Sequence, residues 1–396
     1  MSTRKRIAAL VSIYRKHAHA QHIVDRFLEG YGWNGRHHRP DVDVVALYVD
    51  QVGDDDVSGE RAARHEGLTI YPTIGDALTC GGSDLAVDGV LLIAEHGDYA
   101  VNDKGQTLWP RYEFFQQMAT VFRSCGRSVP VFNDKHLSWN WDWARAMYDT
   151  SLELDFPFMA GSSLPITWRT PSIDMPLGAT VEEAMCVCSS WIDGGDFHAY
   201  ETVQSMVERR AGGETGVKWV KSYRGDELWQ AHHDGVWSRE LFEACLCRSH
   251  QLTPARPGFN NTLPTIDDLR QLVKDPWAYQ YEHHDGLRCT IFAANGLVGD
   301  FNFAARLGGR DEPLSTQMYL PVPTTKSLAS FFSPQVHHIE AMLDTGKTSY
   351  PVERTLLTTG LTAAGLDSRA QEDEVIQTPH LHFDYTASTE STYWRT

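Results

Sequence analysis

The fold is decided by a stretch in the first quarter of the chain, residues 87–99, which reads VDGVLLIAEHGDY. A continuous apolar run that is ended abruptly by polar residues predicts a strand buried on both faces, as in a parallel sheet. Ligands of open α/β sheets bind at the carboxyl ends of such strands. We therefore expect Glu95 and His96, which follow the apolar run, to lie at a ligand site.

Similar apolar runs flank this stretch and alternate with segments of helical periodicity. This alternation predicts a parallel sheet with crossover helices, that is, a Rossmann-type α/β fold. The rhythm fades near residue 160, after which strand-like runs at 217–223, 288–293 and 317–320 predict a mostly antiparallel open sheet. We predict a Rossmann-type domain over residues 1–160, and an α+β domain for substrate binding or oligomerisation, with a C-terminal helix, over residues 161–396.

The composition narrows the class of function. The chain has 396 residues and a formal net charge of −17, which disfavours nucleic acid and anionic membrane surfaces as partners. No apolar run approaches the roughly 18 residues of a membrane span. Seven cysteines, an odd number in a large chain, fit a reducing compartment better than a disulfide framework. We expect a cytoplasmic protein that binds a small-molecule substrate.

Chemically active side chains follow a second strand of the predicted sheet. Asn133-Asp134-Lys135-His136 comes directly after an apolar run, so these residues are expected at the same edge as Glu95. A lysine in a partly desolvated cleft can act as a general acid or base. His198 lies one helical turn before Glu201, and this pair could exchange a proton with a substrate hydroxyl while the carboxylate orients the ring.

The order of these landmarks resembles the Gfo/Idh/MocA oxidoreductases, of which glucose-fructose oxidoreductase and inositol dehydrogenase are members. Asn133-Asp134-Lys135-His136 occupies the place of the family's Glu-Lys-Pro motif, and residues 194–201 (GGDFHAYE) resemble its Asp-x-Gly-x-His-x-x-Asp helix. Residues 42–50 and 350–354 also resemble family segments. The resemblance implies catalytic roles for Lys135 and His198, with His136 and Glu201 beside them.

The same resemblance implies a cofactor, NAD or NADP, and a hydroxyl or carbonyl of a polyol or sugar-like molecule as the reacting group. Asp50 closes the strand that resembles the family's ribose-reading strand, and Glu95 and His96 follow the strand that ends beside the nicotinamide. Members commonly associate through the sheet of the second domain. The resemblance therefore also implies a homo-oligomer.

The chain departs from the family at the first turn. A Gly-x-Gly-x-x-Gly turn lets backbone N–H groups approach a pyrophosphate, because a Cβ atom there would obstruct the approach. Residues 12–19 (SIYRKHAH) contain no glycine. Arg15 and Lys16 could bind phosphate by charge instead. Alternatively, Tyr14 and Arg15 fill the cofactor pocket, and no dinucleotide binds.

Two further residues are candidates for substrate binding. Trp168 and Arg169 follow the strand predicted at residues 156–161. An indole there could stack on a sugar ring, and a guanidinium would suit a carboxylate or phosphate group of a substrate. We predict no metal, since the sequence has no local His-x-x-x-His clamp. The side chains best placed to form one are His96, His136 and His198.

Three hypotheses follow. The first is an NAD(P)-dependent oxidoreductase of the Gfo/Idh/MocA type, and the sequence favours it narrowly. The second is a non-redox enzyme, such as a lyase, isomerase or cyclase, that is cofactor-free or metal-assisted and uses the same cleft with the dinucleotide site lost. The third is a binding protein without turnover.

Overall fold

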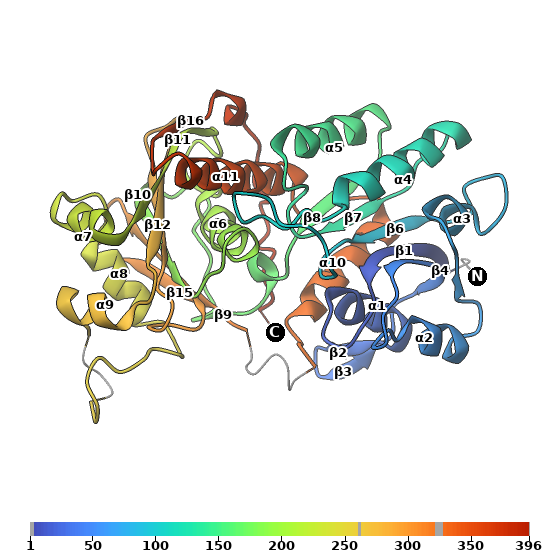
Figure 1. Ribbon diagram of the computed structural model, residues 1–396, viewed down its shortest axis with the longest axis horizontal. Helices are drawn as coiled ribbons and strands as arrows, with labels where there is room; N and C mark the ends of the chain where they lie inside the picture. Colours follow the sequence, from blue (N-terminus) through green and yellow to red (C-terminus); the bar gives the residue numbers. More distant parts are fainter. Residues whose placement is uncertain (1–3, 260–262, 321–327, 396) are drawn as a thin grey trace.

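The computed structural model describes residues 4–259, 263–320 and 328–395, and it consists of two β-sheets that lie side by side, each covered by helices (Figure 1). Two short 3₁₀ helices, Leu164–Ile166 and Pro379–Leu381, belong to the connections. The α/β class predicted from the sequence is confirmed. Among the described residues, no helix combines the length and the apolar character that a membrane span requires.

The first sheet has six strands, and every pairing in it is parallel. Their order is β5-β4-β1-β6-β7-β8. Because all six run in one direction, their carboxyl ends meet at a single edge. The strands are β1 (Lys5–Ile13), β4 (Val42–Gln51), β5 (Thr69–Ile70), β6 (Gly89–Ile93), β7 (Val131–Asp134) and β8 (Phe158–Gly161).

Helices cover both faces of this sheet because successive strand residues point to opposite sides. Ile7 and Ala9 pack with α1 and α10, whereas Ala8 and Leu10 pack with α3 and α4. The helices are α1 (His19–Glu29), α2 (Ser58–Arg64), α3 (Ile74–Thr79), α4 (Arg111–Cys125), α5 (Trp141–Glu153) and α10 (Phe332–Thr345).

Helix α10 comes from the second half of the chain but lies beside α1 on the first sheet (Figure 1). A small hairpin of β2 (Tyr31–Trp33) and β3 (Arg36–His38) contacts the same helix. The division of the chain at residues 160 and 161 therefore stays a prediction.

The second sheet has eight strands in the order β16-β11-β12-β13-β10-β14-β15-β9. Of its described pairings, only that of β10 with β13 is parallel, which confirms the mostly antiparallel sheet. The strands are β9 (Arg169–Thr170), β10 (Val181–Cys188), β11 (Val217–Arg224), β12 (Trp277–His283), β13 (Arg288–Ala293), β14 (Phe301–Leu307), β15 (Leu314–Met318) and β16 (Ile376–Gln377).

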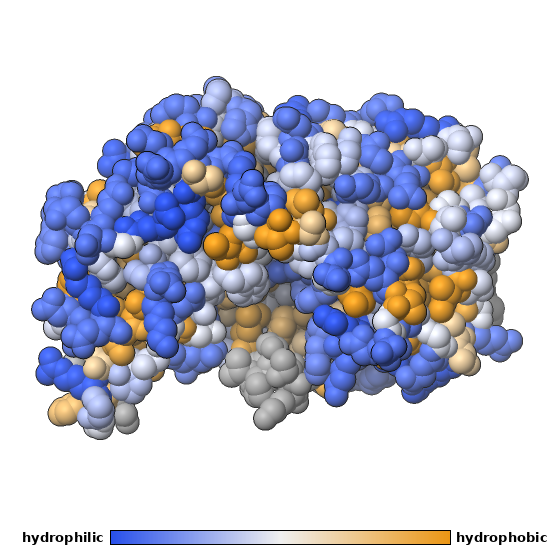
Figure 2. Space-filling model, in the orientation of Figure 1, coloured by the Kyte–Doolittle hydropathy of each residue, from blue (hydrophilic) through white to orange (hydrophobic). Residues whose placement is uncertain are grey.

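Both faces of the second sheet are also covered. Helices α6 (Gly194–Val207) and α11 (Val352–Ala370) lie on the face toward the first sheet, and α7 (Gly225–His233), α8 (Arg239–Leu246) and α9 (Ile266–Leu272) lie on the other (Figure 1). The sequence did not predict these last three helices. The apolar side chains of these helices pack on the apolar residues of the sheet's outer face and bury them. The rest of the molecular surface in this view is mostly polar, with scattered apolar patches (Figure 2).

The end of β8 in the first sheet contacts α6, a helix that covers the second sheet. Gly161, the last residue of β8, has a φ of +123°, and a Cβ atom there would lie 2.9 Å from Glu201 Oε1. A side chain is therefore excluded at this position, and the carboxylate of α6 can reach the strand edge. This contact brings the predicted helix of His198 and Glu201 to the predicted ligand site.

Candidate active site

The site is built from the two loops that follow β6 and β7. His96 and Lys135 both have a φ of +70°, in the left-handed region that residues with a side chain seldom adopt. Each such residue costs about 1–3 kcal/mol, and such residues cluster at functional sites. Both residues are among those that the sequence analysis named as site candidates.

Lys135 and His198 are in contact. Nζ of Lys135 lies 2.5 Å from Nε2 of His198 and 3.7 Å from Oε1 of Glu95, and all three side chains are largely buried. The backbone N–H of Lys135 donates to the carbonyl of Gly161 at 3.1 Å, which ties the loop to β8. The structure therefore brings together residues from three segments that the sequence singled out.

His198 is held as a neutral acceptor of a proton. Burial and the neighbouring Lys135 ammonium lower the pKa of His198 well below its usual value. Its Nδ1 lies 3.0 Å from Ser162 Oγ and 3.3 Å from Glu201 Oε2. We assign the ring proton to Nδ1, because Nε2 faces an ammonium group that can only donate.

Glu201 lies next to His198, on the side away from Lys135. Burial raises the pKa of Glu201 to about 7, although hydrogen bonds from the Ser162 side chain and backbone oppose that rise. The backbone N–H of Ser162 donates to Oε1 at 2.9 Å. A carboxyl with this pKa can hold or release a proton near neutrality.

Glu95 stays ionised on the other side of Lys135. Although burial opposes ionisation, the charges of Lys135 and Arg111 hold the pKa of Glu95 well below its usual range. Arg111, at the start of α4, donates to Oε2 of Glu95 and lies 3.3 Å from a ring nitrogen of His136. His136 in turn lies 3.4 Å from Asp193. His136 therefore supports the site through Arg111, and among the described residues it forms no hydrogen bond to Lys135.

His19 is a site residue that sequence reasoning missed. As the first residue of α1, it reaches across the strand edge, and its Nδ1 lies 2.6 Å from Oδ2 of buried Asp134. A carboxylate only accepts, so Nδ1 carries the proton and Nε2 is the basic nitrogen. Its position where a glycine turn should stand was the signal available in the sequence.

His96 packs against His19, with ring centroids 5.0 Å apart. Burial and the neighbouring His19 lower the pKa of His96 to about 4, so this imidazole is neutral at pH 7. Its Nδ1 is buried and has no hydrogen-bond partner among the described residues. A neutral, unpaired nitrogen at the strand edge is available to a ligand.

Trp191 forms one side of the site. Its indole lies 5.7 Å from Lys135 Nζ and packs edge-on to His198, yet the residue remains 55% exposed. A Cβ atom on Gly195 would lie 2.8 Å from this ring, so the glycine allows the indole to sit against α6. The exposed face offers a stacking surface to a flat or cyclic molecule.

The turn between β1 and α1 is bonded to the protein itself. The hydroxyl of Tyr14 donates to Asp25 at 2.6 Å, and burial followed by the charge of Asp25 raises the pKa of Tyr14. Arg15 lies 3.5 Å from Asp55, and Lys16 is exposed. The Tyr14 hydroxyl is therefore engaged within the protein, which differs from the expected role at a cofactor.

The carboxyl ends of β1 and β4 are likewise occupied. Ser12 Oγ lies 2.9 Å from the carbonyl oxygens of both Glu95 and His96. The Gln51 side chain exchanges two hydrogen bonds with the backbone of Asp98. Asp50, expected to read a ribose, accepts instead from the hydroxyls of Tyr48 and Tyr99, each at 2.8 Å.

These contacts do not fit a dinucleotide. The turn that should cradle a pyrophosphate has no glycine, the ribose-reading carboxylate already accepts two tyrosine hydroxyls, and His19 crosses the strand edge toward Asp134. In this arrangement, a dinucleotide would have to displace groups that satisfy one another. This conflict does not involve the residues around Lys135.

The two predicted substrate residues lie in other surroundings. Arg169 is buried, donates to Asp174 at 2.5 Å and lies over the ring of Tyr393. Trp168 packs on Trp394 with ring centroids 4.1 Å apart. The Arg169 guanidinium is thus paired inside the protein, which differs from the expected position facing a substrate.

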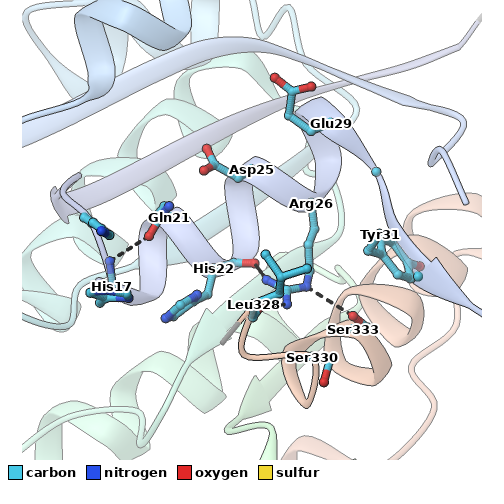
Figure 3. A pocket seen from close by; sticks show the side chains of 13 residues that line it. His17, Gln21, His22, Asp25, Arg26, Glu29, Tyr31, Leu328, Ser330 and Ser333 are labelled. Atoms are coloured by element: carbon cyan, nitrogen blue, oxygen red, sulfur yellow. Dashed lines mark hydrogen bonds between the residues drawn. The ribbon is translucent and has the colours of Figure 1, made fainter. Parts of the chain in front are cut away.

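A separate cavity of about 450 Å³ lies along the other side of α1, against the residues before and at the start of α10 (Figure 3). His22 and Arg26 line it, together with Lys16, and burial followed by the charge of Arg26 lowers the pKa of His22 to about 3. Arg26 donates to the carbonyls of Leu328 and Ala329, so its charge is already engaged. The lining includes none of the residues around Lys135.

The predicted candidates for a metal site do not gather. Among the described residues, the group of three potential ligands whose donor atoms lie within 4.8 Å of one another is His38, His337 and Glu340. His96, His136 and His198 form no such group within that part of the chain.

Comparison with known proteins supports the fold and leaves the chemistry open. No profile of a known protein family matches the sequence, and no curated protein does either. Solved structures do match over nearly the whole chain, at sequence identities that show the fold alone.

Three of these structures illustrate the likeness. GenD2 from gentamicin A biosynthesis, in complex with NAD, has a TM-score of 0.57 at 12% identity, with 95% of this chain and 97% of that one covered. Lactobacillus casei myo-inositol dehydrogenase, with NAD(H) and myo-inositol, has a TM-score of 0.51 at 12% identity, covering 98% and 99%. An Agrobacterium radiobacter oxidoreductase with NAD+, L-tartaric acid and magnesium has a TM-score of 0.53 at 14% identity, covering 95% and 98%. The chain thus has the fold of NAD-binding dehydrogenases.

Proposed function

We propose that the chain is an enzyme that moves protons at a carbonyl- or hydroxyl-bearing carbon of a small polyol- or sugar-like molecule, without a dinucleotide. One observation carries the proposal, namely the 2.5 Å contact between Lys135 Nζ and His198 Nε2 at the edge of the sheet. An ammonium that shares its proton with a neutral imidazole is equipped for general acid–base catalysis.

His19 supplies a second proton-transfer group. Asp134 orients the ring, in the way a buried carboxylate orients a catalytic histidine. Two groups at one edge can act as a base and an acid in the same step. The exposed face of Trp191 supports a substrate with a ring or a flat face.

This pair suits a reaction that begins beside a carbonyl. His19 Nε2 accepts the proton from the carbon next to the carbonyl, and Lys135 donates a proton to the carbonyl oxygen, so that an enediol forms. In an isomerase, His19 returns its proton to the former carbonyl carbon, and Lys135 takes back a proton from the hydroxyl on the neighbouring carbon, which becomes the new carbonyl. In a lyase, a substituent leaves from the carbon on the far side of the deprotonated one and takes the proton from His19, while Lys135 takes back its proton as the original carbonyl re-forms. His198 and Glu201 hold the Lys135 ammonium group in place.

The second candidate is an NAD(P)-dependent oxidoreductase acting on a hydroxyl or carbonyl of the same kind of molecule. The fold shared with solved NAD complexes supports it, as does the resemblance around Lys135 and His198. It requires His19 and Tyr99 to leave their present partners before a dinucleotide can enter.

Titration with NADH and NADPH, followed by cofactor fluorescence, separates the two candidates. The first predicts no saturable binding up to millimolar cofactor, together with exchange of carbon-bound hydrogen into deuterated water for a keto-sugar or keto-polyol substrate. NMR detects the exchange, and Lys135→Met abolishes it. Saturable binding of either cofactor, with substrate-dependent oxidation or reduction, would establish the oxidoreductase instead.

A further inference from the structure

A second group of chemically active side chains lies between the β2–β3 hairpin and α10. His38 ends β3, while His337 and Glu340 stand one turn apart on α10 and therefore face the same side of the helix. Their donor atoms lie within 4.8 Å of one another. None of them takes part in the site around Lys135.

The contacts within the group orient each donor inward. His38 Nε2 lies 2.7 Å from Glu340 Oε2, while Glu340 Oε1 accepts from the backbone N–H of Asp41 at 3.1 Å. Tyr31 stands beside the group, with its hydroxyl 3.3 Å from Glu340 Oε2 and 3.4 Å from His337 Nδ1. One carboxylate oxygen is thus anchored by the backbone, and the other faces the imidazoles.

The ring of His337 is held independently. It stacks on Trp33 with centroids 4.1 Å apart and an interplanar angle of 23°. A ligand ring fixed by stacking loses little conformational freedom when it binds an ion.

We propose that His38, His337 and Glu340 bind one divalent transition-metal ion, for which Zn²⁺ is the best match. Two imidazoles and one carboxylate are a ligand set that zinc accepts, with a water molecule in the fourth position. Ligand atoms around a tetrahedral zinc lie about 3.3–3.5 Å apart, given bonds of about 2.0–2.2 Å. The donors reach that spacing by small side-chain rotations that open the 2.7 Å pair and bring the other donors, which already lie within 4.8 Å, closer together.

The position of the group gives the ion a role. It would join the hairpin near residue 38 to a helix about 300 residues later in the chain, and such a link restricts the unfolded chain strongly. The first residue of α10, Phe332, packs against His19 and His22 with centroids 5.0 and 4.8 Å away. A metal that fixes α10 therefore also stabilises the wall behind His19.

The test is calorimetric titration of the full chain, first treated with EDTA, with Zn²⁺ as the probe. We expect one saturable site per chain and a rise in the thermal unfolding midpoint. His337→Ala and Glu340→Gln should each weaken the affinity by at least about 100-fold, since loss of outer partners alone costs about 10–100-fold. Tyr31→Phe should weaken it less.

His65→Ala is the matched control, because His65 pairs with a single carboxylate, Glu29, at 2.9 Å and lacks a third ligand. This variant should bind zinc like the parent chain. His38→Ala, on the hairpin, replaces His337→Ala if the latter fails to fold by circular dichroism. The proposal is overturned if the parent shows no saturable site, if the ligand variants bind as it does, or if His65→Ala is weakened equally.

Discussion

The loop after β7 and the turn after β1 end at the same edge of the same sheet, yet they differ in what they offer a ligand. After β7, Lys135 meets His198 of helix α6, and these two residues match in type the family that the sequence resembles. After β1, the glycines are absent, and Ser12 and Tyr14 bond to the protein itself. The two side chains of the proposed proton transfer are thus in contact, while the turn where a phosphate-binding loop was expected is bonded to the protein itself.

This difference shows that proteins with the same fold can share one part of a functional site and differ in another. Solved neighbours with NAD match nearly the full length of the chain, although only 12% of the residues are identical. Fold analogy alone therefore cannot assign the cofactor. The two regions can be tested separately.

The largest expected effect lies on the lysine side. Lys135→Met removes the ammonium but keeps much of the side-chain length, so we expect the rate of proton exchange or turnover to fall by about 10²- to 10⁴-fold. Lys104→Ala is the control, because Lys104 pairs with Asp367 at the surface. Equal rates in both variants would remove Lys135 from the chemistry.

The next effect concerns the ion pair behind the lysine. Arg111→Ala leaves Glu95 buried with Lys135 as its remaining cationic partner, and breaking a buried pair costs about 3–5 kcal/mol. Arg123→Ala, which breaks an exposed pair with Glu153, should cost at most about 1 kcal/mol. Urea unfolding of both variants measures the two free energies. A small loss for Arg111→Ala would mean that the cluster does not depend on this pair.

A third prediction concerns pH. The folded-state pKa of Glu201 is raised from 4.5 to about 7, so its protonated form is favoured in the folded chain. The free energy of unfolding should therefore fall as pH rises from about 4.5 to 7. At about 1.4 kcal/mol per pKa unit, the loss is on the order of 3 kcal/mol.

Glu201→Gln removes this titration while retaining an acceptor for the Ser162 N–H. The difference in unfolding free energy between parent and variant reports on Glu201 and not on Asp196. Burial also raises the pKa of Asp196, to about 6. Urea unfolding at several pH values measures it. If the free energy of unfolding of the two proteins changed with pH in the same way, this would contradict a raised pKa for the buried Glu201 carboxyl.

The smallest effect lies on the turn side. Ser12→Ala removes the hydroxyl that faces the carbonyls of Glu95 and His96, which should cost about 0.5–1.5 kcal/mol of unfolding free energy. Ser124→Ala removes a hydrogen bond to Val121 at an exposed position and should change little. If Ser12→Ala instead produced saturable NADH binding, the contacts would be shown to exclude the cofactor, and the turn would count as a suppressed binding site.

Much of the fold could be predicted, because periodicity and strand-ending residues are local signals. The apolar run ending at Ala94 and the polar group after it indicated the strand edge correctly. The covering helices α7, α8 and α9 could not be found, because their short segments gain stability only by packing on the outer face of the sheet.

The site divides in the same way. Lys135 and His198 were found through residue order, whereas the role of His19 depends on a contact with Asp134, 115 residues away. Arg111 reaches Glu95 from helix α4, and Trp191 reaches Lys135 only when the two sheets come together. Sequence spacing carries no information about such contacts.

The edges of the two sheets have a consequence for handling the protein. Three of the four outermost strands, β5, β9 and β16, are two residues long. An edge this short offers almost no unpaired backbone to a strand from another molecule, which is the usual first step of β-aggregation. We expect the folded chain to tolerate high concentration without forming fibrils, and any self-association to occur through side chains.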